Sequence, residues 1–440
     1  MTSKISYPPP DELQQPTNVR TLVFAMACGI SFLLYLHRYT WGFIKTDVKQ
    51  EFGWNDTTMG WVDGLFAFSY AIAQIPSGIV CDWFGSHLLL GTIIILWSVA
   101  LTGFALARDL TSMCAARLAF GIAQAGCYPA LNKVSKNWFP LIGRTAAQGW
   151  IATFSARAGG ALSFILIGPV LLHGLGLTWR EALFVLTVLG IGCGMLFLLL
   201  FRNTPRQHPW ANEAEAELIS LGDSEAAHAT RSVLNWGSLV VNRSIWFLFV
   251  RAFASNLADV VYVYWIPQYL RDEKHLDPSM TGWLAALPLL GGACGGIASG
   301  LLQTRLIKSG VNRRWARSSI GFIGKLMAAT LLLSSLALEQ AVLIATALLV
   351  VKFFSDAEQP AEWGTISDLA GRNAATVFAC VNTMGALGGF IAGPITGYVL
   401  GQFGWNAVFI LTACEYVVAA LAWMLIDCTK PIALSPRTMP

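Results

Sequence analysis

The chain alternates long apolar runs with short polar segments over most of its 440 residues. A run of about 20 apolar residues is long enough to cross a bilayer as one helix. Runs of this kind lie near residues 21–44, 58–81, 88–107, 112–134, 146–172, 181–201, 243–269, 280–303, 317–337, 341–363, 374–400 and 405–427. The pattern therefore predicts an all-α integral membrane protein with twelve transmembrane helices.

One long polar connection divides these runs into two sets of six. We expect a tail at 1–20, a six-helix bundle at 21–201, a linker at 202–242 with a short surface helix near 209–219, a second six-helix bundle at 243–428 and a tail at 429–440. Two halves around a site at the membrane midplane are what a rocking transporter needs. A channel does not require this division. A nucleophile motif, a metal-ligand set and a phosphate-cradling loop are not visible, so we expect no enzyme.

The composition supports the membrane assignment. Hydrophobic residues make up 55% of the chain and charged residues only 12%, whereas soluble domains have about 25% charged residues. Nine cysteines show no metal-ligand spacing and no disulfide framework, and they read as small packing residues. We expect no cofactor, no bound metal and no nucleic-acid partner. The net charge of +4 does not indicate nucleic-acid binding, because the distribution of the charges follows the membrane topology.

Basic residues are concentrated in the loops after the even-numbered runs. These loops contain Lys133, Lys136, Arg144, Arg202, Arg206, Arg231, Arg243, Arg305, Lys308, Arg313, Arg314 and Arg317. Positive loops stay in the cytoplasm, so both termini are expected there, in a multi-pass protein of the plasma (inner) membrane. A removable signal peptide is not predicted, because the proline-rich start lacks a basic region and a cleavage site.

Five cations lie in or near the apolar runs: Arg38, Arg117, Arg157, Lys325 and Lys352. A charge at bilayer depth costs at least about 2.5–3.5 kcal/mol on insertion scales and usually faces a water-filled cavity. Several such cations suggest a pathway for an anion. Structural ion pairs, or long side chains whose heads reach the interface, are the alternative.

Residues 58–86, TMGWVDGLFAFSYAIAQIPSGIVCDWFGS, resemble the second span and following turn of the major facilitator superfamily. The turn keeps Gly78, Asp82 and Gly85 of that superfamily's loop motif. Trp83, Ser86 and His87 replace its usual basic residues, which weakens the charge relay associated with the motif.

Residues 117–149, RLAFGIAQAGCYPALNKVSKNWFPLIGRTAAQG, are similar to span four and the next loop of the anion:cation symporter family within that superfamily. The segments LYLHR, TPRQHPWANEAEAELI, YWIPQYL, EWGTISDLAGR and VNTMGALGGFIAGPITGY extend the similarity over nearly the whole chain. The resemblance implies a secondary active transporter, a monomer that moves a sugar acid or another small organic anion through the lipid bilayer by alternating access. It further implies symport with a proton or a sodium ion.

The same resemblance implies a substrate site between the two halves. Its residues would be Tyr35, Arg38, Tyr70, Arg117, Gln124, Trp363 and Asn382. Arginine presents a planar fork that suits a carboxylate, and Tyr, Trp and Asn side chains can recognise hydroxyl groups. For Tyr70, Trp363 and Asn382, ordinary helix packing is the alternative interpretation.

Two positions depart from the proton-coupled members of that family. They usually have an aspartate just before the span-one arginine and a glutamate seven residues after the span-four arginine, where this chain has His37 and Gln124. Gln124 cannot titrate, but it shares a helix face with Arg117 seven residues earlier, so it is expected to contact the substrate or hold Arg117. Candidate coupling residues are His37, Asp259, Glu358 and Glu362, of which Asp259 is preferred because it lies in the middle of a span.

An alternative resemblance is to the organophosphate:phosphate antiporters. These proteins share Tyr35, Leu36, Arg38 and Gln124, together with a Trp-x-Pro-x-Tyr-Leu motif at the end of span seven. They pair the span-one arginine with a second arginine in span seven, where this chain has Asp259 instead. Arg157 in span five is a possible replacement contact for the anion.

Overall fold

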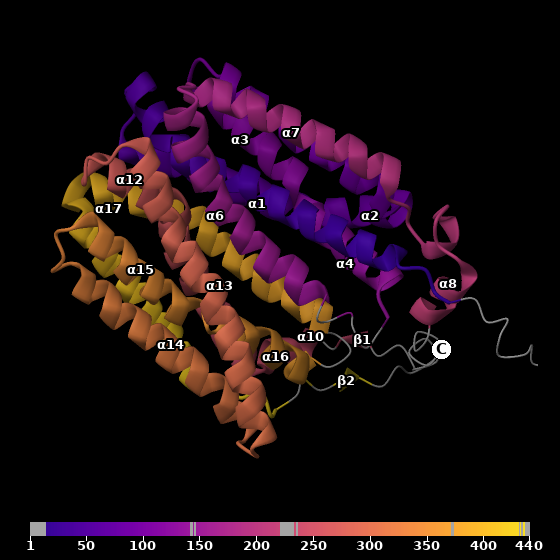
Figure 1. Cartoon of the computed structure of the whole chain (residues 1–440). Coiled ribbons are helices and arrows are strands. Elements are labelled where there is room, and N and C mark those ends of the chain that lie inside the picture. Colours follow the sequence, from indigo (N-terminus) through magenta and orange to yellow (C-terminus); the bar gives the residue numbers. More distant parts are fainter. Residues whose placement is uncertain are drawn as a thin grey trace, which may run out of the picture.

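The computed structural model describes residues 15–140, 144, 147–220, 233–234, 236–370, 374–430, 432 and 434–435. Most of the predicted tails and the middle of the predicted linker, including Arg231, lie outside these residues. Within them the chain is almost entirely helical (Figure 1).

Two helices are far longer than one membrane crossing. α2 (Asp56–Leu106) and α17 (Ala374–Leu425) contain 51 and 52 residues, and each breaks once at a glycine in the left-handed region. Gly85 has φ 80° and Gly404 has φ 76°, a conformation that costs glycine little and other residues more. Each long helix therefore supplies two of the predicted crossings.

The other crossings are single helices or helices with a local break. Single helices are α1 (Val19–Phe52), α7 (Trp179–Leu200), α13 (Pro278–Lys308) and α14 (Arg313–Ser335). Broken ones combine α3 (Leu110–Ala125) with α4 (Cys127–Trp138), η2 (Trp150–Phe154) with α6 (Ser155–Ile165) and η3 (Leu166–Gly174), α11 (Arg243–Val260) with η5 (Val261–Trp265) and α12 (Ile266–Asp272), and α15 (Ala341–Asp356) with α16 (Gln359–Ala370). The described residues thus confirm twelve crossings, and the tenth extends beyond its predicted end at 363.

Short elements lie at the end of the molecule that carries the described parts of both tails. They are η4 (Pro205–Gln207), α8 (Glu213–Ser220), α10 (Trp236–Val241) and the strands β1 (Val233–Leu234) and β2 (Leu434–Ser435), which pair antiparallel. Glu215 of α8 accepts hydrogen bonds from the backbone N–H groups of Val19 and Arg20, at 3.3 and 2.9 Å. The linker helix is thereby fixed to the start of α1.

Helix starts are encoded by local polar residues. Asp109 caps α3 in a reciprocal capping box with Ser112, and Thr178 does the same for α7 with Glu181. Hydrogen bonds from the Ser112 backbone and hydroxyl lower the pKa of the Asp109 carboxyl. These caps place the α2–α3 connection and the start of α7 at the surface of the same end of the bundle.

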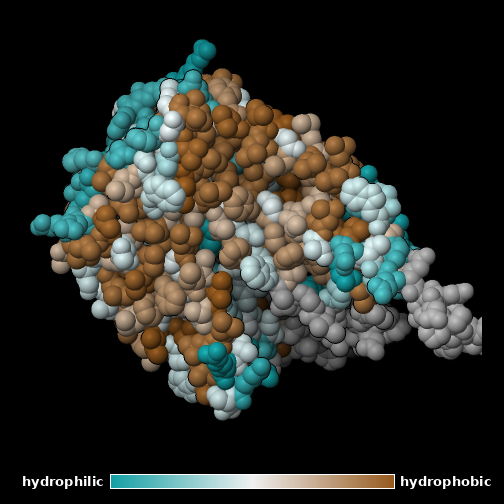
Figure 2. Space-filling model, viewed as in Figure 1, coloured by the Kyte–Doolittle hydropathy of each residue, from teal (hydrophilic) through white to brown (hydrophobic). Residues whose placement is uncertain are grey.

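The outside of the bundle is apolar over a broad region, with hydrophilic residues gathered toward its ends (Figure 2). Among the described residues, eight continuous helices are long and apolar enough to cross a membrane, with α2 and α17 each counted once. Val188 and Leu199 on α7 are 72% and 71% exposed, which suits contact with lipid. The surface therefore agrees with a membrane-spanning protein.

The two halves, α1–α7 and α11–α17, meet closely where α1 ends and α2 begins. A Cβ on Gly393 would collide with the Gly60 carbonyl oxygen, and one on Gly42 would collide with that of Val263. Arg271 also donates two hydrogen bonds to Asp47 across this contact, at 2.5 and 2.7 Å. We call this region the closed end.

Further from the closed end the same helix faces are less tightly packed. Gly389 on α17 is in ordinary contact with Ala67 on α2, at a distance of 3.8 Å from its ideal Cβ. Asn382 lies seven residues before Gly389, which places it on the same face of α17 two turns away. Its side chain is exposed. The contact between α2 and α17 thus loosens from Gly393 toward Asn382.

Candidate substrate-binding site

Arg38 lies within α1, where its guanidinium group is surrounded by aromatic rings. The guanidinium carbon lies 4.9 Å from the ring centre of Tyr35, 5.0 Å from that of Phe66 and 4.8 Å from that of Tyr70. Cations are attracted to ring faces at such distances. The structure therefore brings together three of the predicted site residues, Tyr35, Arg38 and Tyr70.

Gln124 orients the side chain of Arg38 and not that of Arg117, which the sequence predicted as its partner. Arg38 Nε donates to Gln124 Oε1 at 3.0 Å, and Gln124 Nε2 donates to the Leu34 carbonyl oxygen at 3.3 Å. Arg38 Nη2 is buried and has no hydrogen-bond partner among the described residues. A buried donor without a partner is costly, so this nitrogen is a suitable contact for an anionic oxygen.

Arg117 is completely buried, unlike Arg38. Its Nε and Nη2 donate to the carbonyl oxygens of Val62 and Asp63, at 3.3 and 3.4 Å. Its guanidinium carbon lies 5.2 Å from the Phe66 ring centre, so both arginines contact this ring. Neither forms an ion pair with a described carboxylate.

A neighbouring buried ion pair escaped the sequence analysis. Lys45 Nζ lies 2.6 Å from Asp63 Oδ2, and Trp41 Nε1 donates to Asp63 Oδ1 at 2.6 Å. Asp63 inside the second apolar run and Lys45 directly after the first were a visible signal, but their pairing depends on the packing of α1 against α2. Because this pair is neutral in sum, the positive charge that is not paired with a described carboxylate in this half's interior comes from Arg38 and Arg117.

Trp363 and Asn382 lie on the other half. Trp363 is 42% exposed and its ring packs on Phe378, with centres 4.7 Å apart. Asn382 is exposed on the face of α17 that turns toward α2. Their described contacts do not join them to the Arg38 cluster, so a role in binding stays a prediction.

Four charged residues form a closed arrangement between the halves, which we call the four-charge ring. Lys352 Nζ lies 2.6 Å from an oxygen of Asp259 and 2.6 Å from an oxygen of Asp356. Arg157 Nη2 lies 2.7 Å from Asp356 Oδ2 and 3.9 Å from Asp259 Oδ2. Arg157 belongs to α6 in the first half, whereas the other three belong to the second, so the ring joins the halves.

A second charged cluster lies within the second half. Arg251 pairs with Glu358 at 2.9 Å and also with Glu362, while Lys325 Nζ lies 3.0 Å from Glu358. Trp423 Nε1 donates to the second oxygen of Glu358 at 2.6 Å. These contacts favour the alternative interpretation, in which ion pairs stabilise helix packing and do not bind an anion. Arg251 is the main partner of the two glutamates.

His37 lies on a different side of α1 from the Arg38 cluster. It is fully buried, its Nδ1 accepts a hydrogen bond from Trp97 Nε1 at 3.1 Å, and its ring packs against Gly190 of α7. Adjacent residues on a helix point about 100° apart. His37 therefore contacts the interior of the first half.

The loop motif of Gly78, Asp82 and Gly85 lies within α2, around its break, and contacts α4. Lys133 Nζ lies 3.2 Å from Asp82 Oδ1 and donates to the Cys81 carbonyl oxygen at 2.9 Å. At Gly85 the side chain of Asn203 occupies the space that a Cβ would need, whereas Gly78 has open space there. Lys133, from another helix, thus supplies a basic partner for Asp82.

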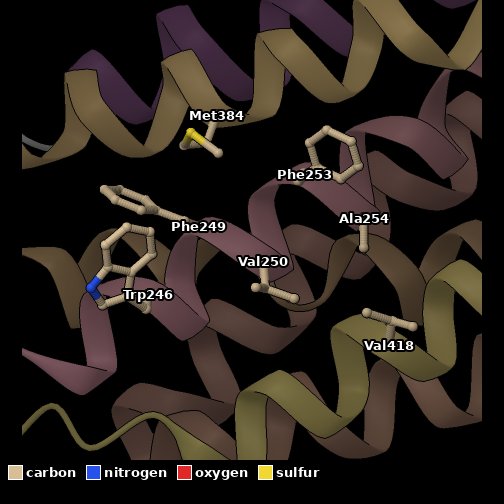
Figure 3. Close-up of a pocket in the computed structure, with 7 residues that line it drawn as sticks. All are labelled: Trp246, Phe249, Val250, Phe253, Ala254, Met384 and Val418. Atoms are coloured by element: carbon tan, nitrogen blue, oxygen red, sulfur yellow. The ribbon is translucent and has the colours of Figure 1, made fainter.

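A separate apolar groove lies between α11 and α17 and is not part of this site (Figure 3). Trp246, Val250 and Val418 line it and are themselves 51%, 44% and 46% exposed. Its lining has no charged residue. A groove of this composition suits a lipid chain more than an anion.

The twelve crossings of the described residues form two halves with buried cations in and between them, which is the arrangement of a membrane transporter. Residues 26–393 match the Major Facilitator Superfamily, and the chain belongs to this family. It is 27% identical to a probable sulfoacetate transporter of Cupriavidus necator, over 94% of this chain and 95% of that one. It is 26% identical to a probable L-galactonate transporter of Escherichia coli, over 96% and 93% of the two chains.

A solved structure agrees with the fold. The crystal structure of a bacterial homologue of the human lysosomal transporter Spinster, in an inward-facing and occupied conformation, superposes with a TM-score of 0.74. The match covers 93% of this chain and 97% of that one at 16% identity. Together with the family match, it confirms the major facilitator fold predicted from the sequence.

Proposed function

We propose that this protein transports a small organic anion, such as a sugar acid, whose carboxylate binds Arg38. The observation that carries the proposal is the buried, unpartnered Nη2 of Arg38, beside a Gln124 that already holds Nε. A guanidinium group held in this way can receive a carboxylate through its remaining N–H groups. The printed names of the relatives, sulfoacetate and galactonate transporters, support an organic anion as substrate.

Transport proceeds by alternating access of the Arg38 site. The closed end blocks one side, and the looser contact between α2 and α17 near Asn382 supports access from the other. The basic loops support an orientation with both termini in the cytoplasm. We propose that the protein acts as a monomer in the plasma (inner) membrane.

Accumulation is driven by symport with a cation, either a proton or sodium. Among the candidate coupling residues, Asp259 is supported best, because its side chain is 31% exposed at the contact between the halves. The His37 and Glu358 side chains are buried within their own halves, away from the contact between them. Asp259→Asn is expected to leave substrate exchange intact and to abolish accumulation driven by a gradient, with Asp368→Asn as the control.

Antiport of a phosphorylated compound is supported less well. A clamp of two arginines would need a cation in span seven, where Asp259 lies, and Arg157 is already paired with Asp356 at 2.7 Å. Exchange of organophosphate for phosphate in the assay below would revive this alternative.

Uptake of radiolabelled sugar acids into proteoliposomes tests the proposal. Arg38→Ala is expected to abolish saturable uptake while the protein stays folded, and Arg38→Lys is expected to be poor, because an ammonium group lacks the fork geometry. Arg206→Ala is the matched control, since Arg206 is 71% exposed and pairs with Glu213 outside the crossings. Wild-type uptake by Arg38→Ala would refute the assignment.

A further inference from the structure

The two walls between which a substrate would bind carry different charge. On the first half, Arg38 and Arg117 have no described carboxylate partner. On the second half, the four-charge ring is neutral in sum when Arg157 is included. Its side chains are 1% exposed for Lys352, 3% for Asp356 and 11% for Arg157, but 31% for Asp259. The ring therefore presents mainly a carboxylate to the space between the halves.

An aromatic pair separates this carboxylate from Arg38. The Arg38 guanidinium lies over Tyr35, and the Tyr35 and Tyr39 ring centres are 5.5 Å apart. Tyr39 packs on Gly160, which lies one turn of α6 beyond Arg157. Tyr35 and Tyr39 thus lie between Arg38 and the turn of α6 that follows Arg157, a separation that suits a small extended molecule.

The two oxygens of Asp259 are used unequally. Lys352 holds Oδ1 at 2.6 Å, whereas Arg157 lies 3.9 Å from Oδ2, beyond hydrogen-bond distance. Oδ2 can therefore accept hydrogen bonds from a ligand. The ring's cations are less suitable as ligand contacts, because both are nearly buried and pair closely with Asp356.

We infer that Asp259 makes the site selective for monoanions that carry hydroxyl groups at their other end. The carboxylate of the substrate binds Arg38, and hydroxyl groups at the opposite end donate to Asp259 Oδ2. A dianion would place its second negative charge nearest to Asp259, the most exposed charge of the ring, where like charges repel and a hydroxyl group is preferred. This inference rests on the proposed function and narrows its substrate class.

Competition for the exchange of a labelled six-carbon aldonate into proteoliposomes that contain unlabelled aldonate tests the inference, because exchange is expected to stay intact in Asp259→Asn. Two competitors of equal carbon number are compared, the unlabelled aldonate with one carboxylate and the corresponding aldarate with two, at neutral pH where both are fully ionised. Wild-type protein should require an aldarate concentration at least about tenfold higher for half-inhibition. Asp259→Asn should reduce this ratio to about threefold or less, because the amide keeps an acceptor oxygen and removes the charge.

Asp368→Asn is the matched control and should keep the wild-type ratio. Asp368 is likewise an aspartate of the second half, is 21% exposed and pairs with Arg317 at 2.5 Å. An aldarate that competes as well as the aldonate in wild-type protein would overturn the inference, even if Asp259→Asn did not fold. So would a ratio unchanged by Asp259→Asn. Failure of the proposed function looks different, since saturable aldonate uptake would then be absent or insensitive to Arg38→Ala.

Discussion

Arg38 Nε donates a hydrogen bond of 3.0 Å to Gln124 Oε1, across the contact between α1 and α3. The acceptor is uncharged, so it positions the guanidinium group without neutralising it. A carboxylate at the same place would form an ion pair with Arg38 and would compete with the substrate for that charge.

Gln124→Glu should therefore weaken substrate binding at neutral pH. We expect the KM for uptake to rise by at least about tenfold, or about 1.4 kcal/mol. Acid pH that protonates the introduced carboxylate should bring the KM back toward the wild-type value. Uptake measured between pH 5 and 8 checks this. Gln124→Met, which lacks both the charge and the hydrogen bond, should raise the KM with no such recovery, and equal pH profiles for the two variants would contradict the explanation.

Arg117→Ala should impair both the fold and transport, whereas Arg38→Ala should impair transport and leave the fold intact. Arg117 is fully buried and donates to the carbonyl oxygens of Val62 and Asp63, and hydrogen bonds from charged groups contribute about 1.5–3 kcal/mol each. Thermal unfolding in detergent should show a lower midpoint for Arg117→Ala and a midpoint near wild type for Arg38→Ala. Equal midpoints for the two variants would show that the buried contacts of Arg117 add no stability.

Glu358→Gln should destabilise the second half strongly. Glu358 faces Arg251 and Lys325 in a buried cluster, and loss of one partner of a buried ion pair costs about 3–5 kcal/mol. Glu362→Gln should cost less, because Arg251 keeps its contact with Glu358. Yield of folded protein and unfolding midpoints compare the two. If Glu358→Gln is stable but cannot accumulate substrate, Glu358 is a coupling residue instead.

Gly393→Ala should disturb the closed end, whereas Gly389→Ala should be tolerated. A Cβ on Gly393 would collide with the Gly60 carbonyl oxygen, but one on Gly389 would lie 3.8 Å from Ala67, an ordinary contact. Transport rate and unfolding midpoint should both fall for Gly393→Ala only. Gly389→Leu is the more severe test of the same face, and wild-type transport by that variant would show that the face does not close during the cycle.

The family resemblance supplied the members of the Arg38 cluster, namely Tyr35, Arg38, Tyr70 and Gln124. Helix geometry explains one of their contacts, because Tyr35 and Arg38 are one helical turn apart and share a face. Sequence could also indicate that His37 and Arg38 point in different directions, but not which of them faces the interior of the half.

Partner choice between helices could not be predicted. The pairing of Lys45 with Asp63 depends on how α1 packs on α2, and that of Arg157 with Asp356 on how the halves meet. The sequence alone does not show which of several cations pairs with Asp63 or with Asp356. Only the three-dimensional packing decides which charges cancel and which remain available.

The ion pairs at the closed end make that end sensitive to the salt concentration of the surrounding solution. Arg271 and Asp47 are 13% and 20% exposed, and Lys49 pairs there with Asp56 at 2.7 Å and with Asp272 at 3.6 Å. Ion pairs that remain accessible to water are screened by dissolved salt, within a Debye length of about 8 Å at physiological ionic strength. The backbone contact of Gly60 with Gly393 is insensitive to salt. Ionic strength on that side should therefore change how readily the halves separate there, so that the salinity of one compartment acts as a control on the transport cycle.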